Sequence, residues 1–347
     1  MAGIEPAGDG RVLEGTVLAG PDYDPVRGRV VVEAGRIEAV EEADVATSDI
    51  VCPALVNAHT HIGDSVAKDA GRGLSLEELV APPDGLKHRL LRAAEPAELV
   101  AAMRRSARLM ARTGTAAFVD FREGGLEGVE QLREAVDGLA IEAVALGRGP
   151  PDVLDVADGY GAPSARDGEF GAQREAAREA DKAFAIHAGE VDAGDINGGF
   201  DLDPTFLVHM TNPEPVHLER LADRGTPVVV CPRSNVATGV GVPPVADLLE
   251  RTTVALGTDN VMLNGPSMFR EMEWTAKLCD VADVEVLRMA TRAGAELAGL
   301  DAGVVEPGRA AKLVVLDGES DNLAGTEDPV RAVVRRAGAA DVTQVVL

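Results

Sequence analysis

Short apolar strands alternate with helical stretches through the middle of the chain, and this alternation constrains the fold more than any other feature of the sequence. Repeated strand, helix, strand units are typical of parallel sheets covered by their crossover helices. The apolar segments predict eight strands, beginning with PALVNAHTH at 53–61 and continuing near 115–121, 140–146, 153–157, 183–187, 205–209, 227–231 and 253–258. Eight parallel strands can close into a ring, so we expect an α/β fold, a (β/α)8 TIM-like barrel.

The two ends of the chain have β character outside this pattern. VLEGTVLAG and GRVVVEAGRIEAVEEA near the N-terminus, and AAKLVVLD and RAVVRRAG near the C-terminus, all read as strands. We expect these pieces to join in one small β-sandwich. The predicted organisation is a composite β-sandwich domain of residues 1–51 and 305–347, with a barrel domain of residues 52–304 inserted into it.

The chain lacks the sequence features of a membrane or exported protein. It has no stretch of about 18 uncharged apolar residues and no basic N-terminal region that leads into an apolar run. Cys52, Cys231 and Cys279 lie far apart in apolar sequence, as buried free thiols of a reducing compartment do, and they lack the spacing of a cysteine metal site. We therefore expect a soluble cytoplasmic protein.

The charge balance is strongly acidic. The 347 residues include 58 acidic and 33 basic side chains, for a net charge of −25, and five of the basic residues are lysines. This charge argues against nucleic acids and anionic membranes as partners. Acid enrichment with so few lysines resembles the proteins of salt-loving archaea, in which concentrated salt screens the self-repulsion. We favour a halophilic archaeal origin over the alternative, an ordinary acidic bacterial protein.

Residues of the kind that bind metals end four of the predicted strands. His59 and His61 flank Thr60 at the end of the first strand, where residues i and i+2 point to the same face. His187 ends AFAIH, His209 ends TFLVH and Asp259 ends TVALGTD. Barrel enzymes place their chemistry at the carboxyl ends of the strands, so we expect these side chains to converge.

Each of these residues also has a purely structural interpretation. A lone histidine in an apolar strand is more often a hydrogen-bonded core residue than a metal ligand. A single His-x-His pair is therefore weak evidence. Four strands that all end in such residues are harder to assign to chance, and together they indicate a metal site.

The motifs around these residues resemble those of the amidohydrolase superfamily, most closely its branch of cytosine-, guanine- and adenosine-type deaminases and chlorohydrolase-like proteins. The resemblance covers nearly the whole chain and implies both the barrel and the split sandwich. It includes PALVNAHTHIGDS at 53–65, HAGE at 187–190, VHMTNPE at 208–214, CPRSN at 231–235, GTDN at 257–260, ATRAGAELAGL at 290–300 and EPGRAAKLVVLD at 306–317. The chain is short for this branch, which puts the usual lid and helical insertions in question.

The resemblance implies a metal site that can be carried over residue by residue. The ligands would be three neutral imidazoles and one carboxylate, those of His59, His61, His187 and Asp259. Three nitrogens and one oxygen suit a divalent metal, Zn²⁺ first and Fe²⁺ as the alternative, with a position left open for water.

We expect one metal per chain. Two-metal members of the superfamily need a bridging carboxylated lysine or a glutamate on a middle strand. VLDVADGYGAPS contains no lysine, and Lys182 precedes His187 by too many residues to reach the same site. His209 is then expected to be a second-sphere group that orients the water and the developing oxyanion.

Glu190 follows His187 by three residues, where the deaminases of this branch carry a glutamate that protonates a ring nitrogen and passes the proton to the leaving amine. Such general acid–base help contributes roughly a hundred- to ten-thousand-fold. Asp259 could hold the proton released by the attacking water. We therefore name Glu190, His209 and Asp259 as catalytic, while a helix cap or a solvent-facing carboxylate is the structural alternative for Glu190.

These residues predict a metal-dependent aminohydrolase that attacks an amino-substituted carbon of a small nitrogen heterocycle, such as a nucleobase, nucleoside or pterin, and releases ammonia. The alternative is a cyclic amide, imide or chloro-heterocycle hydrolase with the same metal site. Amide-hydrolysing relatives usually lack the acid at Glu190, which favours deamination. A non-catalytic scaffold is the third reading, and the retained ligands argue against it. A homodimer is the commonest assembly for such an enzyme.

Polar residues in the loops after barrel strands are candidates for binding substrate. We interpret Lys68 and Asp69, after the first strand, and Asn235, after the seventh, in this way, although solvated charges and a loop-holding amide are the structural alternatives. The sequence leaves the same question open for Asp64, Arg72 and His88, and for Arg122 and Glu123, which suit either a pocket rim or an internal ion pair.

Overall fold

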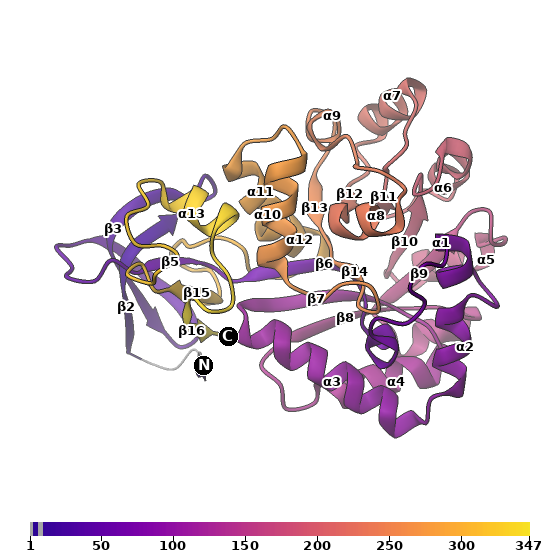
Figure 1. The fold of residues 1–347 in the computed structure, drawn as a ribbon, viewed down its shortest axis with the longest axis horizontal. Helices are drawn as coiled ribbons and strands as arrows, with labels where there is room; N and C mark the ends of the chain where they lie inside the picture. The colour runs from indigo at the N-terminus through magenta and orange to yellow at the C-terminus, as the bar shows by residue number, and fades with distance from the viewer. Residues whose placement is uncertain (1–2, 6–9) are drawn as a thin grey trace.

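The computed structural model describes residues 3–5 and 10–347, which form a barrel from the middle of the chain and a β-sheet from both ends. In Figure 1 the sheet lies at the left and the barrel at the right. The two ends of the chain meet because the strand at 3–5 pairs with the last strand, with Gly3 opposite Gln344. The α/β barrel with a terminal β structure that the sequence predicts is confirmed.

All strand pairings in the barrel are parallel. The spatial order follows the sequence from β6 to β13, and β14, which comes shortly after β13, pairs with β6 and closes the ring. The strands are β6 (Leu55–His61), β7 (Thr115–Arg122), β8 (Glu142–Gly147), β9 (Gly159–Ser164), β10 (Ala183–Ala188), β11 (Phe206–His209), β12 (Val228–Val230), β13 (Val254–Leu256) and β14 (Asp259–Asn260). The predicted eighth strand is therefore split into two short pieces.

The fourth strand is not where the sequence predicts it. Residues 151–155, within the apolar segment VLDVA and its flank, form the 3-10 helix η2 (Pro151–Asp155), which begins with a proline at its first position. The strand is β9, whose apolar pattern is interrupted by glycines. A Cβ at Gly159 would lie 2.5 Å from the carbonyl oxygen of Ala183, and one at Gly161 would lie 2.6 Å from the ring of Phe121. Close packing thus requires glycine at these positions. The glycines interrupt the run of apolar side chains by which a buried strand is recognised in a sequence.

The helices cover the outside of the barrel through one apolar face each. In α3 (Pro96–Arg112) the buried residues recur at helical spacing, Leu99, Ala102, Met103, Ala107 and Met110 among them, and Pro96 occupies the first turn. The other helices of this layer are α4 (Gly125–Val136), α5 (Gly171–Glu179), α6 (Ile196–Asp201) after the short η3 (Ala193–Asp195), α7 (Pro215–Arg224), α8 (Pro232–Thr238), α9 (Val245–Leu249), α10 (Met268–Leu278), α11 (Asp283–Ala290) and α12 (Arg292–Ala298).

A longer excursion follows the first barrel strand. It comprises η1 (Ile62–Ala67), α1 (Leu76–Val80) and α2 (Leu86–Ala93), and it precedes α3. Ser75 caps α1 with its hydroxyl, and Glu78 completes the capping box. Residues of this excursion line the cavity at the carboxyl end of the barrel. We call residues 62–95 the covering segment.

The ends of the chain form one seven-stranded sheet of mainly antiparallel strands. Its order is β1-β16-β15-β5-β2-β3-β4. The bounds are β1 (Gly3–Glu5), β2 (Arg11–Ala19), β3 (Asp24–Glu33), β4 (Arg36–Glu42), β5 (Ile50–Pro53), β15 (Leu313–Leu316) and β16 (Val342–Val346). The strand β5 leads directly into β6, so the sheet and the barrel share a continuous stretch of chain.

The segment RAVVRRAG is a helix, whereas its sequence predicts a strand. Helix α13 (Pro329–Arg335) starts after Asp328, whose side chain accepts a hydrogen bond from the backbone N–H of Arg331, and Pro329 fits the first turn. Such a cap and a proline at the first position favour a helix over a strand, even in a valine-rich segment. The last strand of the sheet is instead β16.

The described residues bear on two expectations from the sequence, the lack of a membrane-spanning segment and the presence of free, buried cysteines. No helix there is long and apolar enough to cross a bilayer. Cys52 and Cys231 are buried and Cys279 is half-buried, and all three are free thiols. Burial raises the pKa of Cys52 to about 12, so this thiol is an uncharged part of the core.

Candidate metal centre

The ligand-type residues of the sequence converge at the carboxyl end of the barrel. His59 and His61 come from β6, His187 from β10, and Asp259 begins β14. All four are buried, with exposed fractions of 0%, 3%, 9% and 1%. Strands β6 and β14 are hydrogen-bonded neighbours, which brings the two histidines of β6 next to Asp259.

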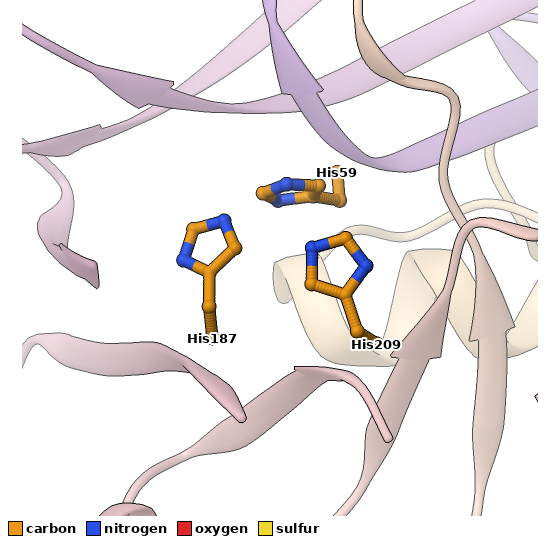
Figure 2. A group of neighbouring side chains, drawn as sticks. All are labelled: His59, His187 and His209. Atoms are coloured by element: carbon orange, nitrogen blue, oxygen red, sulfur yellow. The ribbon is translucent and has the colours of Figure 1, made fainter. Parts of the chain in front are cut away.

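The side chains form overlapping groups in which one ligand atom from each residue lies within 4.8 Å of the others. Figure 2 shows the rings of His59, His187 and His209 facing a common space from three strands. The groups are His59 with His61 and Asp259, His59 with His187 and His209, and Glu190 with His209 and Asp259. The described residues therefore contain a histidine and aspartate cluster of metal-binding geometry.

His59 carries the strongest sign that a metal belongs here. Both nitrogens of its fully buried ring lack a hydrogen-bond partner. Buried polar atoms without partners are rare and costly. Its Nε2 lies 3.3 Å from Oδ1 of Asp259, and a cation between the two would satisfy both atoms. The residues present thus fit a divalent metal.

Burial keeps the imidazoles in the form that binds metals. It lowers the pKa of His59 to about 4. Burial, together with the nearby ammonium of Lys87, lowers the pKa of His61 to about 3. Both rings are neutral at pH 7, so their lone pairs are available to a metal.

Hydrogen bonds orient two of the rings. Nδ1 of His187 donates to the carbonyl oxygen of Ala162 over 2.9 Å. Nδ1 of His61 lies 3.2 Å from both the carbonyl oxygen of Phe121 and Oε1 of Glu123. With the hydrogen on Nδ1, each ring presents the lone pair of Nε2 to the centre, the arrangement common among metal-binding histidines.

Asp259 is held by its own neighbours and by an unusual backbone conformation. Its φ angle of 56° lies in the left-handed region that non-glycine residues rarely adopt. Ser234 donates its hydroxyl to Oδ2 over 2.7 Å, and Asn260 donates its amide to Oδ1 over 3.1 Å. Oδ1 also lies 3.5 Å from Nε2 of His61. The carboxylate is therefore fixed toward the histidines.

The glycine of the GTDN motif allows this close approach. A Cβ at Gly257 would lie 2.6 Å from the Cβ of His59 and 2.9 Å from its backbone nitrogen and oxygen. Since no side chain fits at such distances, glycine lets the connection between β13 and β14 run directly against the strand that carries His59.

His209 and Glu190 lie beside the ligand group and face each other. Asn235 donates its amide to Nδ1 of His209 over 3.2 Å, which leaves the hydrogen on Nε2. That Nε2 lies 3.6 Å from Oε2 of Glu190. Burial raises the pKa of Glu190 above its usual value. His209 has a φ of 81°, a second left-handed residue at this site.

A cavity of about 580 Å³ opens onto this centre. Volumes of this order are typical of small-molecule sites. Its wall is polar near the histidines and partly apolar near the covering segment. It is lined by His61, Ser75, Leu76, Glu77, Val80, Ala81, Pro82, Lys87, Arg148, Pro163, Ser164, Arg166, Asp167, His187, Glu190, Val191, Asp195, His209, Val240, Asp259 and Asn260.

The loop residues predicted to bind substrate lie elsewhere. Lys68 and Asp69, which directly follow η1, are exposed and do not line the cavity. Arg72 is exposed too. Asn235 is fully buried under His209, where it orients that ring instead of reaching the cavity. The structure therefore gives these residues no contact with the cavity.

The sequence also leaves open whether Asp64 and His88 of the covering segment contact substrate. Asp64 is fully buried and forms an ion pair with Lys87. Nε2 of His88 forms a hydrogen bond with the carbonyl oxygen of Val80 over 3.0 Å. Neither lines the cavity. Both hold the covering segment together.

Lys87 and Arg148, two of the cations that line the cavity, are not identified by the sequence interpretation. Arg148 follows β8 directly, so the rule that polar residues at strand ends line the site was sufficient to find it. Lys87 lies in α2, away from any strand end, and no pattern in the sequence marks it. Both contact Oε1 of Glu123, at 3.0 Å and 2.7 Å respectively.

Comparison with known proteins agrees with this geometry. The profile of the amidohydrolase family matches residues 50–154 and 153–347. A protein of Methanothermobacter thermautotrophicus that carries a provisional aminohydrolase name is 38% identical, with 97% of each chain covered. A protein of Halobacterium salinarum named 5-methylthioadenosine/S-adenosylhomocysteine deaminase is 31% identical over 97% of this chain and 90% of that protein.

Solved structures share the fold. A zinc-containing adenosine deaminase from Xanthomonas campestris superimposes with a TM-score of 0.77 at 20% identity and covers 98% of this chain and 92% of its own. Atrazine chlorohydrolase from Arthrobacter aurescens complexed with zinc gives a TM-score of 0.79 at 19% identity, over 97% and 93%. At these identities the likeness is one of fold.

Proposed function

This chain belongs to the amidohydrolase family and is a hydrolase of carbon–nitrogen bonds, and from that premise we propose that it is a zinc-dependent deaminase of amino-substituted nitrogen heterocycles. The observation that carries this proposal is the buried ligand group of His59, His61 and Asp259 with Glu190 beside it on the cavity wall. Water replaces the amino group at a ring carbon, and ammonia leaves.

The proposed ligands are His59, His61, His187 and Asp259. Bound there, a divalent metal would supply a Lewis acid that lowers the pKa of water from 15.7 to about 7. Three nitrogens and one carboxylate oxygen support Zn²⁺ as the resident metal, with Fe²⁺ as the alternative. We propose one metal per chain, because Lys182 donates to the carbonyl oxygens of Leu154 and Ala157 and not to the ligand group.

The proton transfers are assigned to three side chains around the cavity. Asp259 accepts the proton released by the attacking water. Glu190 gives its proton to the ring nitrogen, and the hydroxyl proton of the resulting adduct then passes through Glu190 to the leaving amine, after which the proton held by Asp259 restores Glu190. Burial raises the pKa of Glu190, a shift in the direction that favours the proton-donating form. His209, with its hydrogen on Nε2, donates a hydrogen bond to the oxygen that becomes negatively charged.

The names of relatives support an amino-purine as the first substrate to test. Relatives include proteins named as deaminases of 5-methylthioadenosine, S-adenosylhomocysteine and 5'-deoxyadenosine. We propose that the substrate here is a heterocycle of this kind, and the cavity volume of about 580 Å³ leaves room for a substituent on the ring.

Ammonia release tests the proposed function. The zinc-loaded protein is incubated with amino-purine nucleosides, amino-pyrimidines and amino-pterins, and with a cyclic amide and a chloro-heterocycle as controls. We expect ammonia from at least one amino-heterocycle and no turnover of the two controls. Hydrolysis of the amide or release of chloride without any deamination would replace this proposal by the alternative hydrolase function.

We further propose that the acidic surface is an adaptation to concentrated salt. The net charge of −25 and the five lysines support this, as does a relative from Halobacterium salinarum. Thermal stability should rise steeply from about 0.1 M to about 3 M KCl, because the Debye length falls from about 10 Å to below 3 Å. A sucrose series controls for preferential exclusion. Equal melting temperatures across the KCl series would reject the adaptation.

A further inference from the structure

A buried lysine from the covering segment reaches the metal centre without contacting a proposed ligand directly. Lys87 lies in α2, its side chain is 3% exposed, and it lines the cavity. Its Nζ lies 2.7 Å from Oε1 of Glu123 and 3.5 Å from Oδ2 of Asp64. A lysine is rarely buried so fully, and the proposed reaction assigns it no task.

Glu123 connects this lysine to a proposed metal ligand. The residue directly follows β7, and its Oε1 lies 3.2 Å from Nδ1 of His61. The same oxygen lies 3.0 Å from Nη1 of Arg148, while Oε2 has no hydrogen-bond partner. One carboxylate oxygen thus contacts Lys87, Arg148 and His61, and two cations hold it beside the ring.

We propose that Lys87 is a positioning residue, which fixes the ring of His61 for metal binding by holding Glu123 in place. A carboxylate that accepts the N–H of a metal-binding histidine, on the ring nitrogen that does not bind the metal, sets the orientation of that ring and the position of its free lone pair. Because Lys87 belongs to the covering segment, seating that segment over the cavity is part of forming the metal site. This inference rests on the proposed metal centre, but not on the identity of the substrate.

Substitution of Lys87 also affects Asp64, and the experiment must separate the two effects. Neither oxygen of the fully buried Asp64 has a hydrogen-bond partner, and Lys87 is its ion-pair partner. Removing the lysine alone leaves a buried carboxylate uncompensated, which destabilises the fold whatever happens at the metal. The double variant Lys87→Met/Asp64→Asn removes both charges and restores the balance.

The test measures the Zn²⁺ affinity of each purified variant by competition with a chelator, together with thermal unfolding of the metal-free protein. We expect Lys87→Met, Lys87→Met/Asp64→Asn and Glu123→Gln each to bind Zn²⁺ about ten- to a hundredfold more weakly than wild type. Lys87→Arg should recover most of the affinity, since a guanidinium can still hold Glu123. The control Lys182→Met removes a lysine that bonds two backbone carbonyl oxygens away from the ligand group and should bind Zn²⁺ as wild type does.

Two results would overturn the inference while leaving the proposed function intact. The first is wild-type Zn²⁺ affinity in the double variant, which would mean that Lys87 only balances the charge of Asp64. The second is unchanged affinity in Lys87→Met with a raised KM, which would make Lys87 a substrate contact. Failure of the wild-type protein itself to bind Zn²⁺ would overturn the proposed metal centre and this inference with it.

Discussion

Replacing His59 or Asp259 by alanine is expected to empty the metal site and abolish ammonia release. The ring nitrogens of His59 have no hydrogen-bond partner among the described residues. Oδ1 of Asp259 lies 3.3 Å from Nε2 of His59 and 3.5 Å from Nε2 of His61. Loss of either side chain removes one of the four proposed donors and weakens the binding of the metal. Since the pKa of water would return toward 15.7, turnover should fall roughly ten-thousand-fold or more.

Elemental analysis and ammonia release measure this prediction. Wild type should carry about one metal per chain. His217→Ala is the matched control. His217 is a buried histidine that caps α7, and its Nδ1 accepts a hydrogen bond from the backbone N–H of Glu214. This variant should lose some stability and keep its metal. Two tightly bound metals per chain would contradict the mononuclear site, and a full metal content in His59→Ala would remove that residue from the ligand set.

Replacing Glu190 by glutamine should lower turnover at least about a hundredfold, or about 2.7 kcal/mol of transition-state stabilisation, with metal content unchanged. Glutamine keeps the size and hydrogen bonding of the side chain but removes the proton that can be transferred. Glu190 lies on the cavity wall with Oε2 3.6 Å from Nε2 of His209. The Michaelis constant should change much less than kcat, because the interaction is made in the transition state.

A second glutamate of the cavity provides the control. Glu77 lines the cavity from α1 and is exposed, so Glu77→Gln makes the same side-chain substitution on the cavity wall without touching the proposed proton path. This variant should retain most of its turnover. If Glu190→Gln keeps more than about a tenth of wild-type turnover with a full metal site, the acid–base role assigned to it is wrong.

The sequence predicted those parts of the fold that depend on local pattern. Seven of the eight barrel strands lie where apolar runs place them, because a buried parallel strand needs an apolar side chain at nearly every position. The exceptions have local causes. In β9 the contacts of Gly159 and Gly161 exclude side chains, and in α13 the cap by Asp328 outweighs the β-preference of valine.

The convergence of the ligand-type residues followed from the same reasoning. Once β6, β10 and β14 belong to one barrel, residues at their carboxyl ends lie at the same end of it, and His59 is accordingly grouped with His187 on one side and with Asp259 on the other. The roles assigned to these residues remain predictions until the variants are measured.

What the sequence by itself determined is therefore the barrel, the terminal β structure and the grouping of residues at strand ends, since these follow from periodicity and from the alternation of strands and helices. The tertiary structure decided what faces the cavity. Lys68 and Asp69 are exposed and Lys87 is buried against Glu123, although all three lie in the same charged stretch after β6. The path of the covering segment is set by packing against the barrel and not by local pattern, so only the folded chain could show which of its charges reaches the metal centre.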